Sequence, residues 1–239
     1  MQYIGGKFRI GKQLASFLQS KLKPGQTYIE PFCGACWVMQ EIKADKRIAS
    51  DGCVPLVMMF QELQKGWIPP KNVTMAEYHQ TIKEPRSMAL LAFVRIACSF
   101  AGKWEGGYAK NSRGDNYALS GHNSLLKKLP LIKDAEFRIV DHYKDLLTGI
   151  KGNLIYCDPP YASAHRNQYR YFKEPFDHKE FWDIVRESSK YNDVYVSEYS
   201  APDDFECVLE IKAKLDLRTK GDPTRIERLF KYNKDYQRT

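Results

Sequence analysis

One short segment sets where a strand of this protein must stop. Residues 153–161 read NLIYCDPPY, in which the apolar run Leu154–Cys157 has the length of a buried strand. Asp158 precedes a proline and is biased towards extended backbone, and Pro160 has no N–H with which to continue a central ladder. The strand therefore ends with a carboxylate and an aromatic ring, at the edge where open α/β sheets bind ligands. A plain strand followed by a Pro-Pro turn is the alternative interpretation.

Strand and helix patterns alternate over much of the chain. Helical spacing of apolar residues predicts helices at about 10–22, 37–42 and 178–191. Short apolar runs predict strands at 28–30, 47–50, 137–140, 154–157 and 194–199. Such alternation is typical of a mainly parallel sheet with helices on both faces, so the predicted fold class is α/β.

The alternation breaks between residues 61 and 135. The centre of this segment, 102–124, is rich in Gly, Asn and Ser with basic and aromatic residues between them, and this composition predicts loops. We therefore expect two regions, a catalytic region formed by residues 1–60 and 136–239 and an inserted region formed by residues 61–135.

The composition is that of a globular protein, with 43% hydrophobic and 13% aromatic residues among 239. The longest apolar-rich run, Met88–Phe100, is too short to span a bilayer and contains Arg95. The N-terminus lacks the apolar core of a signal peptide. Cys33 and Cys36 have metal-type spacing, but no second pair follows them. We therefore expect a soluble intracellular protein with buried thiols, no metal and no membrane association.

Positive charge is concentrated in two segments. The net charge is +8, and residues 71–134 hold ten Lys/Arg against five Asp/Glu. Residues 211–239 hold nine against four, whereas the remainder of the chain holds eighteen against twenty. This distribution favours a polyanionic partner, and an ordinary basic surface is the alternative. In the second segment, Arg225, Arg228 and Lys231 predict either phosphate-backbone contacts or a basic helix face.

Three motifs stand in a characteristic order: Tyr3-Ile4-Gly5-Gly6-Lys7, Glu30-Pro31-Phe32-Cys33-Gly34 and Asp158-Pro159-Pro160-Tyr161. In these motifs, in their order and in the inserted region between them, the chain resembles the Dam-type (alpha-group) N6-adenine-specific DNA methyltransferases. The resemblance implies a Rossmann-like class I methyltransferase sheet with an inserted, mostly helical and loop, target-recognition region. It also implies S-adenosyl-L-methionine as cofactor and double-stranded DNA as substrate.

The chemistry of that reaction accounts for the residue types of the last motif. The exocyclic N6 of adenine is a poor nucleophile, because its lone pair is delocalised into the ring. The resemblance implies that Asp158 accepts one N6–H and the Pro159 carbonyl accepts the other, with Pro160 fixing the backbone. Tyr161 would offer its ring to a base that has left the duplex, where stacking contributes roughly 1–3 kcal/mol.

The other two motifs supply the predicted cofactor site. The small-residue loop that follows the first strand allows a ligand to approach the backbone. Asp51 ends the next strand and is placed to accept hydrogen bonds from ribose hydroxyls, with a turn aspartate as the alternative. The family often has glycine where this chain has Cys36, which leaves the path of the loop open. The predicted cofactor-binding residues are Tyr3, Lys7, Pro31, Phe32, Cys33, Gly34, Asp51 and Asp158.

The inserted region supplies the predicted DNA contacts. Lysines and arginines there are candidates for phosphates, the aromatic residues for stacking, and Arg113 and Asn116 for base edges. Taken singly, each is more ordinarily a surface lysine or a core aromatic. The candidates are Lys103, Trp104, Tyr108, Lys110, Arg113, Asn116, Lys127 and Lys128.

Two other functions remain open from the sequence. The same chemistry would serve an adenine N6 in RNA or a cytosine N4 in DNA, and a non-catalytic DNA-binding relic would keep the motifs without turnover. The intact Asp158 and the motif order favour adenine in DNA. The resemblance further implies a cytoplasmic protein encoded by a bacterium or a phage, within DNA methylation or restriction-modification, and a monomer suffices for the reaction.

Overall fold

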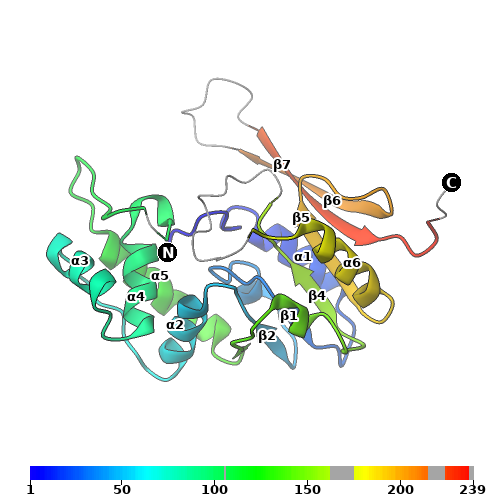
Figure 1. Cartoon of the computed structure of the whole chain (residues 1–239), viewed down its shortest axis with the longest axis horizontal. Helices are drawn as coiled ribbons and strands as arrows, with labels where there is room; N and C mark the ends of the chain where they lie inside the picture. Colours follow the sequence, from blue (N-terminus) through cyan, green and yellow to red (C-terminus); the bar gives the residue numbers. More distant parts are fainter. Residues whose placement is uncertain (105, 162–174, 215–223, 237–239) are drawn as a thin grey trace.

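The structure is a computed structural model, and it describes residues 1–104, 106–161, 175–214 and 224–236. Within these residues seven strands form one sheet in the order β3-β2-β1-β4-β5-β7-β6 (Figure 1). The strands are β1 Tyr28–Glu30, β2 Arg47–Ala49, β3 Glu136–Phe137, β4 Leu154–Cys157, β5 Asp193–Glu198, β6 Phe205–Lys214 and β7 Thr224–Tyr232.

The sheet is mostly parallel. Every neighbouring pair from β3 to β5 runs parallel, and β7 runs antiparallel to both β5 and β6. A long antiparallel hairpin at one edge of an otherwise parallel sheet is common in α/β proteins. This mixed α/β sheet confirms the predicted Rossmann-like fold class.

Apolar side chains cover both faces of the sheet, as the short apolar strands required. Along β4, Leu154 and Tyr156 join one core cluster, whereas Ile155 and Cys157 join the other. The helix α1, Gly11–Lys21, packs Leu14 and Leu18 into the first cluster. The helix α6, His178–Ser189, packs its apolar side chains into the second cluster. The period of two along the strands thus places one helix layer on each face.

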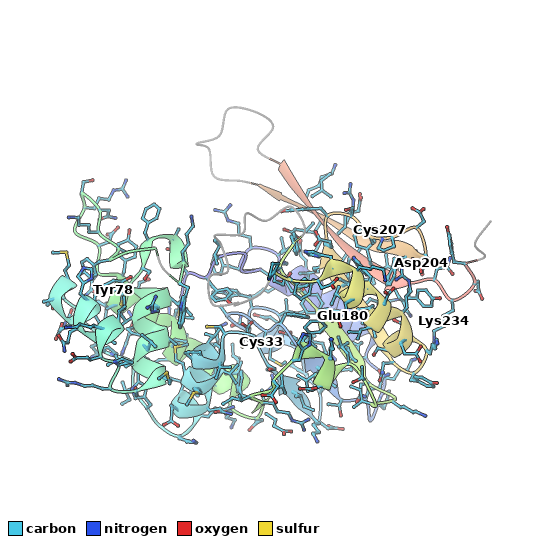
Figure 2. The ribbon with its side chains drawn as sticks, in the orientation of Figure 1. Cys33, Tyr78, Glu180, Asp204, Cys207 and Lys234 are labelled. Atoms are coloured by element: carbon cyan, nitrogen blue, oxygen red, sulfur yellow. The ribbon has the colours of Figure 1, made fainter. Side chains whose placement is uncertain are left out.

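The described part of the chain has four further α-helices, α2 Val54–Gln64, α3 Met75–Lys83, α4 Met88–Ala97 and α5 Tyr117–Ile132, and the 3₁₀ turns η2 Phe100–Gly102 and η3 Tyr143–Leu146. The helices α3, α4 and α5 gather at one end of the molecule, away from the β6–β7 hairpin (Figure 1). In this helical part Tyr78 is buried, and its hydroxyl lies 2.8 Å from Ser99 Oγ (Figure 2). The helix α2 runs across the expected region boundary at residue 60. Its Phe60 shares a core cluster with Phe93 of α4, so the core is continuous there.

Several elements differ from the sequence predictions. The predicted helix at 37–42 is only the 3₁₀ turn η1, Met39–Glu41, and the predicted strand at 137–140 is only β3. Arg228 and Lys231 lie on β7, so the basic helix face is wrong. The short strand β3 is held by its parallel neighbour β2, and β7 by antiparallel pairing with β5 and β6, which is tertiary information that local propensity does not carry.

The loop prediction for residues 102–124 is wrong in its last part, because α5 begins at Tyr117. Asn116 caps this helix by accepting a hydrogen bond from Leu119 N at 2.8 Å. Gly121 lies where α5 crosses α4, and a Cβ added to it would come 2.6 Å from the Cβ of Ala97. The glycine that suggested a loop is therefore a close-packing residue inside a helix.

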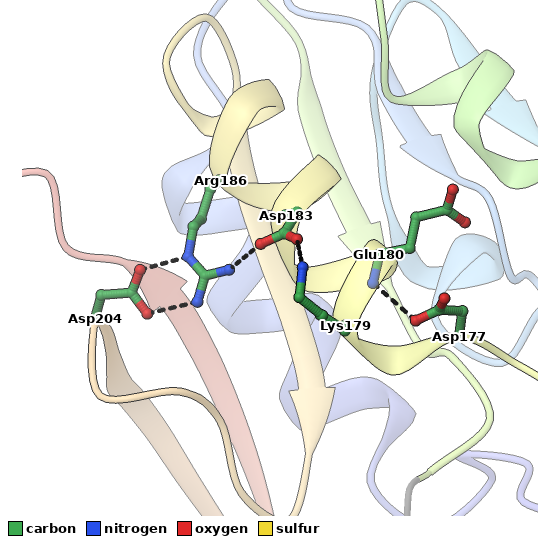
Figure 3. A network of polar contacts seen from close by, with 6 residues as sticks. All are labelled: Asp177, Lys179, Glu180, Asp183, Arg186 and Asp204. Atoms are coloured by element: carbon green, nitrogen blue, oxygen red, sulfur yellow. Dashed lines mark hydrogen bonds and ion pairs between the residues drawn. The ribbon is translucent and has the colours of Figure 1, made fainter.

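A network of ion pairs ties α6 to the segment before β6 (Figure 3). Arg186 donates to both carboxylate oxygens of Asp204 and also to Asp183, which in turn accepts from Lys179. Asp177 caps the start of α6 by accepting from Glu180 N at 2.9 Å. The network anchors α6, and the residues at its start reach the pocket described below.

None of the helices in the described part of the chain has the length and apolar character to cross a membrane.

Candidate active site

The candidate site lies where the strand order reverses, between β1 and β4. These strands pair in parallel, with Ile29 opposite Ile155, so their carboxyl ends meet at the same edge. From there the connection after β1 leads towards β2 and the connection after β4 leads towards β5. The diverging loops leave a crevice at this point of an α/β sheet. The motif at 31–34 follows β1 and the motif at 158–161 follows β4, so the fold brings the two motifs together.

Asp158 holds an ion pair in this crevice. Lys7 Nζ lies 2.7 Å from Asp158 Oδ1, and the Lys7 side chain is only 7% exposed. Burial raises the pKa of Asp158, and the charge and hydrogen bond of Lys7 oppose that shift. The structure therefore pairs Lys7 with the catalytic candidate, and the contact of Lys7 with the cofactor stays a prediction.

Tyr161 is fixed by a residue that the sequence analysis missed. Its hydroxyl donates a hydrogen bond of 2.7 Å to Glu227 Oε2 on β7, and Glu227 is 7% exposed. Lys7 Nζ lies 4.7 Å from the centre of the Tyr161 ring and 3.9 Å from Glu227 Oε2. The ring of Tyr199 meets the Tyr161 ring edge-on at 4.8 Å. Asp158, Lys7, Tyr161 and Glu227 thus form one buried cluster.

The sequence carried a signal for Glu227. In strand β7, Glu227 stands two residues before the buried Leu229 and so lies on the same face of the sheet. A carboxylate in the buried phase of an alternating strand is a candidate functional residue, because burial of a charge is costly without a partner. The sequence analysis considered residues 211–239 only for their positive charge, so it missed the alternation that places Glu227 on the buried face.

The loop after β1 is shaped by backbone hydrogen bonds to Asp51. Gly34 N donates to Asp51 Oδ2 at 2.8 Å, and Cys53 N donates to Asp51 Oδ1 at 2.9 Å. Burial raises the pKa of Asp51 to about 6, although both amide hydrogen bonds oppose the shift. Cys36 adopts a left-handed conformation with φ 56°, which is the backbone geometry that glycine favours. The chain therefore keeps a glycine-like path at the position where the family often has glycine.

The N-terminal motif closes over this loop through Tyr3. Gly34 has φ +46°, and a Cβ added to it would lie 3.0 Å from Tyr3 Cε1. The absence of a side chain at Gly34 thus allows the Tyr3 ring to rest on the loop. Tyr3 is held in turn by the helical part, because Ile4 N donates to the Gly102 carbonyl at 3.4 Å.

A pocket of about 310 Å³ opens beside the loop, past the ends of β1 and β2. Phe32, Tyr143 and Phe176 supply aromatic walls, and the rings of Phe32 and Tyr143 lie 5.1 Å apart. The described lining also contains four carboxylates and no lysine or arginine; the carboxylates are Asp51, Asp141, Asp177 and Glu180. Glu180 and Cys33, the latter in the loop after β1, are marked in Figure 2.

This donor set fits a cationic nucleoside such as S-adenosylmethionine. The aromatic walls suit an adenine ring, and the carboxylates suit ribose hydroxyls and positive charge. Of the predicted cofactor residues, Pro31, Phe32 and Asp51 line the pocket. Cys33, Gly34 and Tyr3 form the adjoining loop and its cover, whereas Lys7 and Asp158 lie in the buried cluster.

The predicted DNA-contact residues divide into surface and structural positions. Lys103, Lys110, Arg113 and Lys127 are exposed on the helical part. Tyr108 donates to the Val73 carbonyl at 2.9 Å, and Trp104 lies half-buried beside the guanidinium of Arg95. Asn116 is exposed, but its side chain also caps α5 and contacts the Lys71 carbonyl. The exposed cations remain predicted phosphate contacts.

Lys128 differs from its predicted surface position. It is 2% exposed, and its ammonium lies 3.3 Å from the Cys36 carbonyl and 3.8 Å from the centre of the Trp37 ring. It also donates to Gln40 Oε1. Burial lowers the pKa of Lys128 to about 8. Lys128 is therefore not available to a phosphate in this structure, and it braces the cofactor loop from α5.

The side chains bear on two other kinds of site, a metal site and a cysteine pair. Among the described residues there is no group of three or more His, Cys, Asp or Glu side chains that could hold a metal ion. The six cysteines are free thiols, and five of them are buried. Cys33 and Cys36 belong to the packed loop after β1.

The comparison with known families adds a match over the first part of the chain. Residues 3–91 match the family model of D12 class N6 adenine-specific DNA methyltransferases. The match covers the first two motifs, including Tyr3, Lys7, the loop at 31–34 and Asp51. The resemblance predicted from the sequence is confirmed over these residues. It supports an adenine-specific methyltransferase with S-adenosylmethionine as cofactor.

Among solved structures the chain is similar to several methyltransferases at low identity. The putative methyltransferase yhhF from Escherichia coli is 11% identical with a TM-score of 0.39, over 94% of this chain and 84% of that one. TrmN from Thermus thermophilus is 12% identical with a TM-score of 0.38, over 92% and 48%. The putative methyltransferase SMU.472, complexed with SAH, is 10% identical with a TM-score of 0.35, over 97% and 55%. The chain spans about half the length of the last two proteins. No curated protein matches the chain significantly.

Proposed function

We propose that this protein transfers a methyl group from S-adenosylmethionine to the exocyclic N6 of an adenine in double-stranded DNA. The observation that carries the proposal is the placement of residues 158–161 at the carboxyl end of β4, beside the loop after β1 and the acidic, aromatic pocket. The family match over residues 3–91 supports adenine and DNA as the target.

The roles of the chain's own residues follow from their chemistry. The carboxylate of Asp158 accepts one N–H of the adenine amino group, and the Pro159 carbonyl accepts the other. Both acceptors are preorganised by the strand end and by the fixed φ of the prolines, so little reorganisation is needed at the moment of reaction. When bound, S-adenosylmethionine supplies an electrophilic methyl group. The aromatic walls and carboxylates of the pocket hold and orient that cofactor next to Asp158.

The target adenine must leave the duplex to reach Asp158, because a stacked base cannot enter a buried site. The Tyr161 ring, which is buried beside Lys7, compensates for part of the lost stacking. The exposed cations Lys103, Lys110, Arg113 and Lys127 hold the phosphate backbone.

The test is transfer of a labelled methyl group from S-adenosylmethionine to unmethylated duplex DNA, followed by digestion to nucleosides. We expect label in N6-methyladenine with the wild-type protein. Asp158→Ala removes the N6–H acceptor and is expected to lower the rate by at least about 100-fold, the usual scale for one preorganised group. Asp134→Ala, which removes an exposed carboxylate after α5, serves as the control and is expected to retain the rate.

Other outcomes of the same experiment identify the alternatives. Label in N4-methylcytosine, or transfer to structured RNA alone, would change the substrate and keep the site. Wild-type rates in Asp158→Ala would contradict the role of that carboxylate. DNA binding without transfer at saturating cofactor would indicate a non-catalytic protein.

A further inference from the structure

Glu227 lies outside all three sequence motifs, yet it contacts the residues that carry them. We propose that Glu227 is a positioning residue for methyl transfer, which holds the Tyr161 ring and receives the Lys7 ammonium when the adenine amino group takes its place on Asp158. The inference rests on the proposed function and extends it to strand β7 at the far side of the buried cluster.

Glu227 fixes the orientation of the Tyr161 ring. The Tyr161 hydroxyl donates to Glu227 Oε2 at 2.7 Å, and a hydrogen bond to a carboxylate is shorter and stronger than a neutral one. Tyr199 limits the ring from another side, with the ring centres 4.8 Å apart. A base that stacks on Tyr161 therefore meets a ring whose orientation is set by Glu227.

Lys7 occupies one of the acceptor oxygens of Asp158. Its ammonium donates to Asp158 Oδ1 at 2.7 Å, which is the same kind of contact that the adenine amino group must make. In the proposed exchange the adenine amino group takes the Oδ1 position, and Lys7 moves away from it. Glu227 Oε2 lies 3.9 Å from Lys7 Nζ and already counts as an ion-pair partner. A short movement of one flexible side chain transfers Lys7 from Asp158 to Glu227.

Glu227 also keeps the displaced charge paired. An unpaired ammonium is unfavourable in a buried site, so displacement of Lys7 without a second carboxylate would oppose adenine entry. With Glu227 present, Lys7 stays paired before and after the exchange, and Asp158 becomes free to accept from the neutral base. Glu227 thus lowers the free-energy difference between the closed cluster and the adenine-bound state.

The test separates the two roles of Glu227 by conservative variants. Glu227→Gln keeps an oxygen acceptor for the Tyr161 hydroxyl but removes the charge that pairs with Lys7. Tyr161→Phe removes the hydroxyl and keeps the charge, so a lower kcat in this variant reports the loss of the hydrogen bond that holds the ring. Glu210→Gln is the matched control, because Glu210 lies on the neighbouring strand β6, pairs with Arg228 at 2.7 Å and is 51% exposed. The readouts are kcat and KM for DNA and for S-adenosylmethionine, together with thermal unfolding.

We expect Glu227→Gln to lower kcat about tenfold or more, with an unchanged KM for S-adenosylmethionine and an unchanged unfolding temperature. Glu210→Gln is expected to leave all three quantities at wild-type values. Because the loss arises from Lys7, the effect of Glu227→Gln on kcat is expected to shrink in a Lys7→Met background. Such non-additivity marks residues that act on one another.

Two outcomes would overturn the inference while the proposed function stands. One is an active wild-type protein whose Glu227→Gln variant keeps kcat within about twofold. The other is a kcat loss that is equal in the Lys7 and Lys7→Met backgrounds, which would show that the loss does not arise from a transfer of Lys7 between Asp158 and Glu227. A wild-type protein that methylates no nucleic acid would instead overturn the proposed function, and this inference with it.

Discussion

At the scale of single residues, buried acids gather where β1, β2 and β4 end. Burial raises the pKa of Asp51 and Asp158, and it raises the pKa of Glu30 to about 8. Glu30 is the last residue of β1, and its Oε1 accepts a hydrogen bond of 2.7 Å from the Tyr28 hydroxyl. A Lys7 ammonium next to Asp158 offsets part of this acidic charge. The site is therefore assembled at a cost in stability, which is common at functional positions.

Glu30 gives the clearest pH prediction. The unfolded chain releases the Glu30 proton near pH 4.5, whereas the folded chain keeps it until about pH 8. Between these values the folded state binds more protons, so the contribution of Glu30 to the free energy of unfolding falls as pH rises. Glu30→Gln cannot ionise and keeps an acceptor for Tyr28. We expect the variant to match wild type near pH 5 and to be more stable by on the order of a few kcal/mol near pH 8.

The measurement is urea unfolding of both proteins between pH 5 and 8. Glu62→Gln is the control, because its carboxylate lies at the surface of α2 and pairs with Lys65 there. A stability difference between wild type and Glu30→Gln that stays constant over this range would contradict the raised pKa.

Single residues also show which parts of the candidate site could be predicted from the sequence. The order of the motifs, through its resemblance to a known family, predicts Asp158, Tyr161 and the loop at 31–34 as site residues. The pairing of Lys7 with Asp158, and of Tyr161 with Glu227, joins positions 151 and 66 residues apart. Such partners are chosen by the packing of strands that are distant in the chain, so local patterns do not reveal them.

At the scale of elements, α5 connects the helical part to the cofactor loop. Its adjacent residues Lys127 and Lys128 have opposite environments, since Lys127 is exposed and Lys128 is buried under η1. Sequence alone treated the two lysines alike, because neither residue type nor spacing shows which side of α5 meets Trp37 and the Cys36 carbonyl. The five predicted strands followed from their apolar runs, whereas β6 and β7 were missed and the helix at 37–42 was predicted too long.

The adjacent lysines Lys127 and Lys128 give a prediction in which one variant is the control for the other. Lys128→Met removes the contacts to the Cys36 carbonyl and Gln40, so we expect cofactor affinity to fall roughly five- to tenfold, or about 1 kcal/mol. Lys127→Met is expected to leave cofactor affinity unchanged. For DNA binding, it is expected to reduce the slope of log affinity against log salt concentration by about one. Equilibrium binding of S-adenosylmethionine and DNA titrations at several salt concentrations measure both. Equal cofactor affinities in the two variants would refute the bracing role of Lys128.

At the scale of the whole molecule, both basic segments border the N-terminal motif. The helical part reaches it through Gly102, whose carbonyl accepts from Ile4 N, and β7 reaches it through Glu227 and Lys7. The start of α6 instead presents a surface rich in carboxylates, with Asp177, Glu180 and Asp183 around Lys179 (Figure 3). The asymmetry of charge favours DNA on the face that carries the N-terminal motif and disfavours it at α6.

This asymmetry predicts a localised salt dependence of DNA binding. A protein that neutralises several phosphates loses affinity linearly on a logarithmic salt scale, with a slope of about −0.9 per phosphate contact. We expect the Lys103→Met, Lys110→Met double variant to reduce the slope by about two, because both lysines are exposed on the helical part. Lys179→Met, which removes an 88% exposed cation that pairs with Asp183, is expected to leave the slope unchanged. Affinities measured by fluorescence anisotropy between about 50 and 200 mM salt distinguish the two variants. An equal reduction of the slope in both would mean that net charge, and not this face, controls binding.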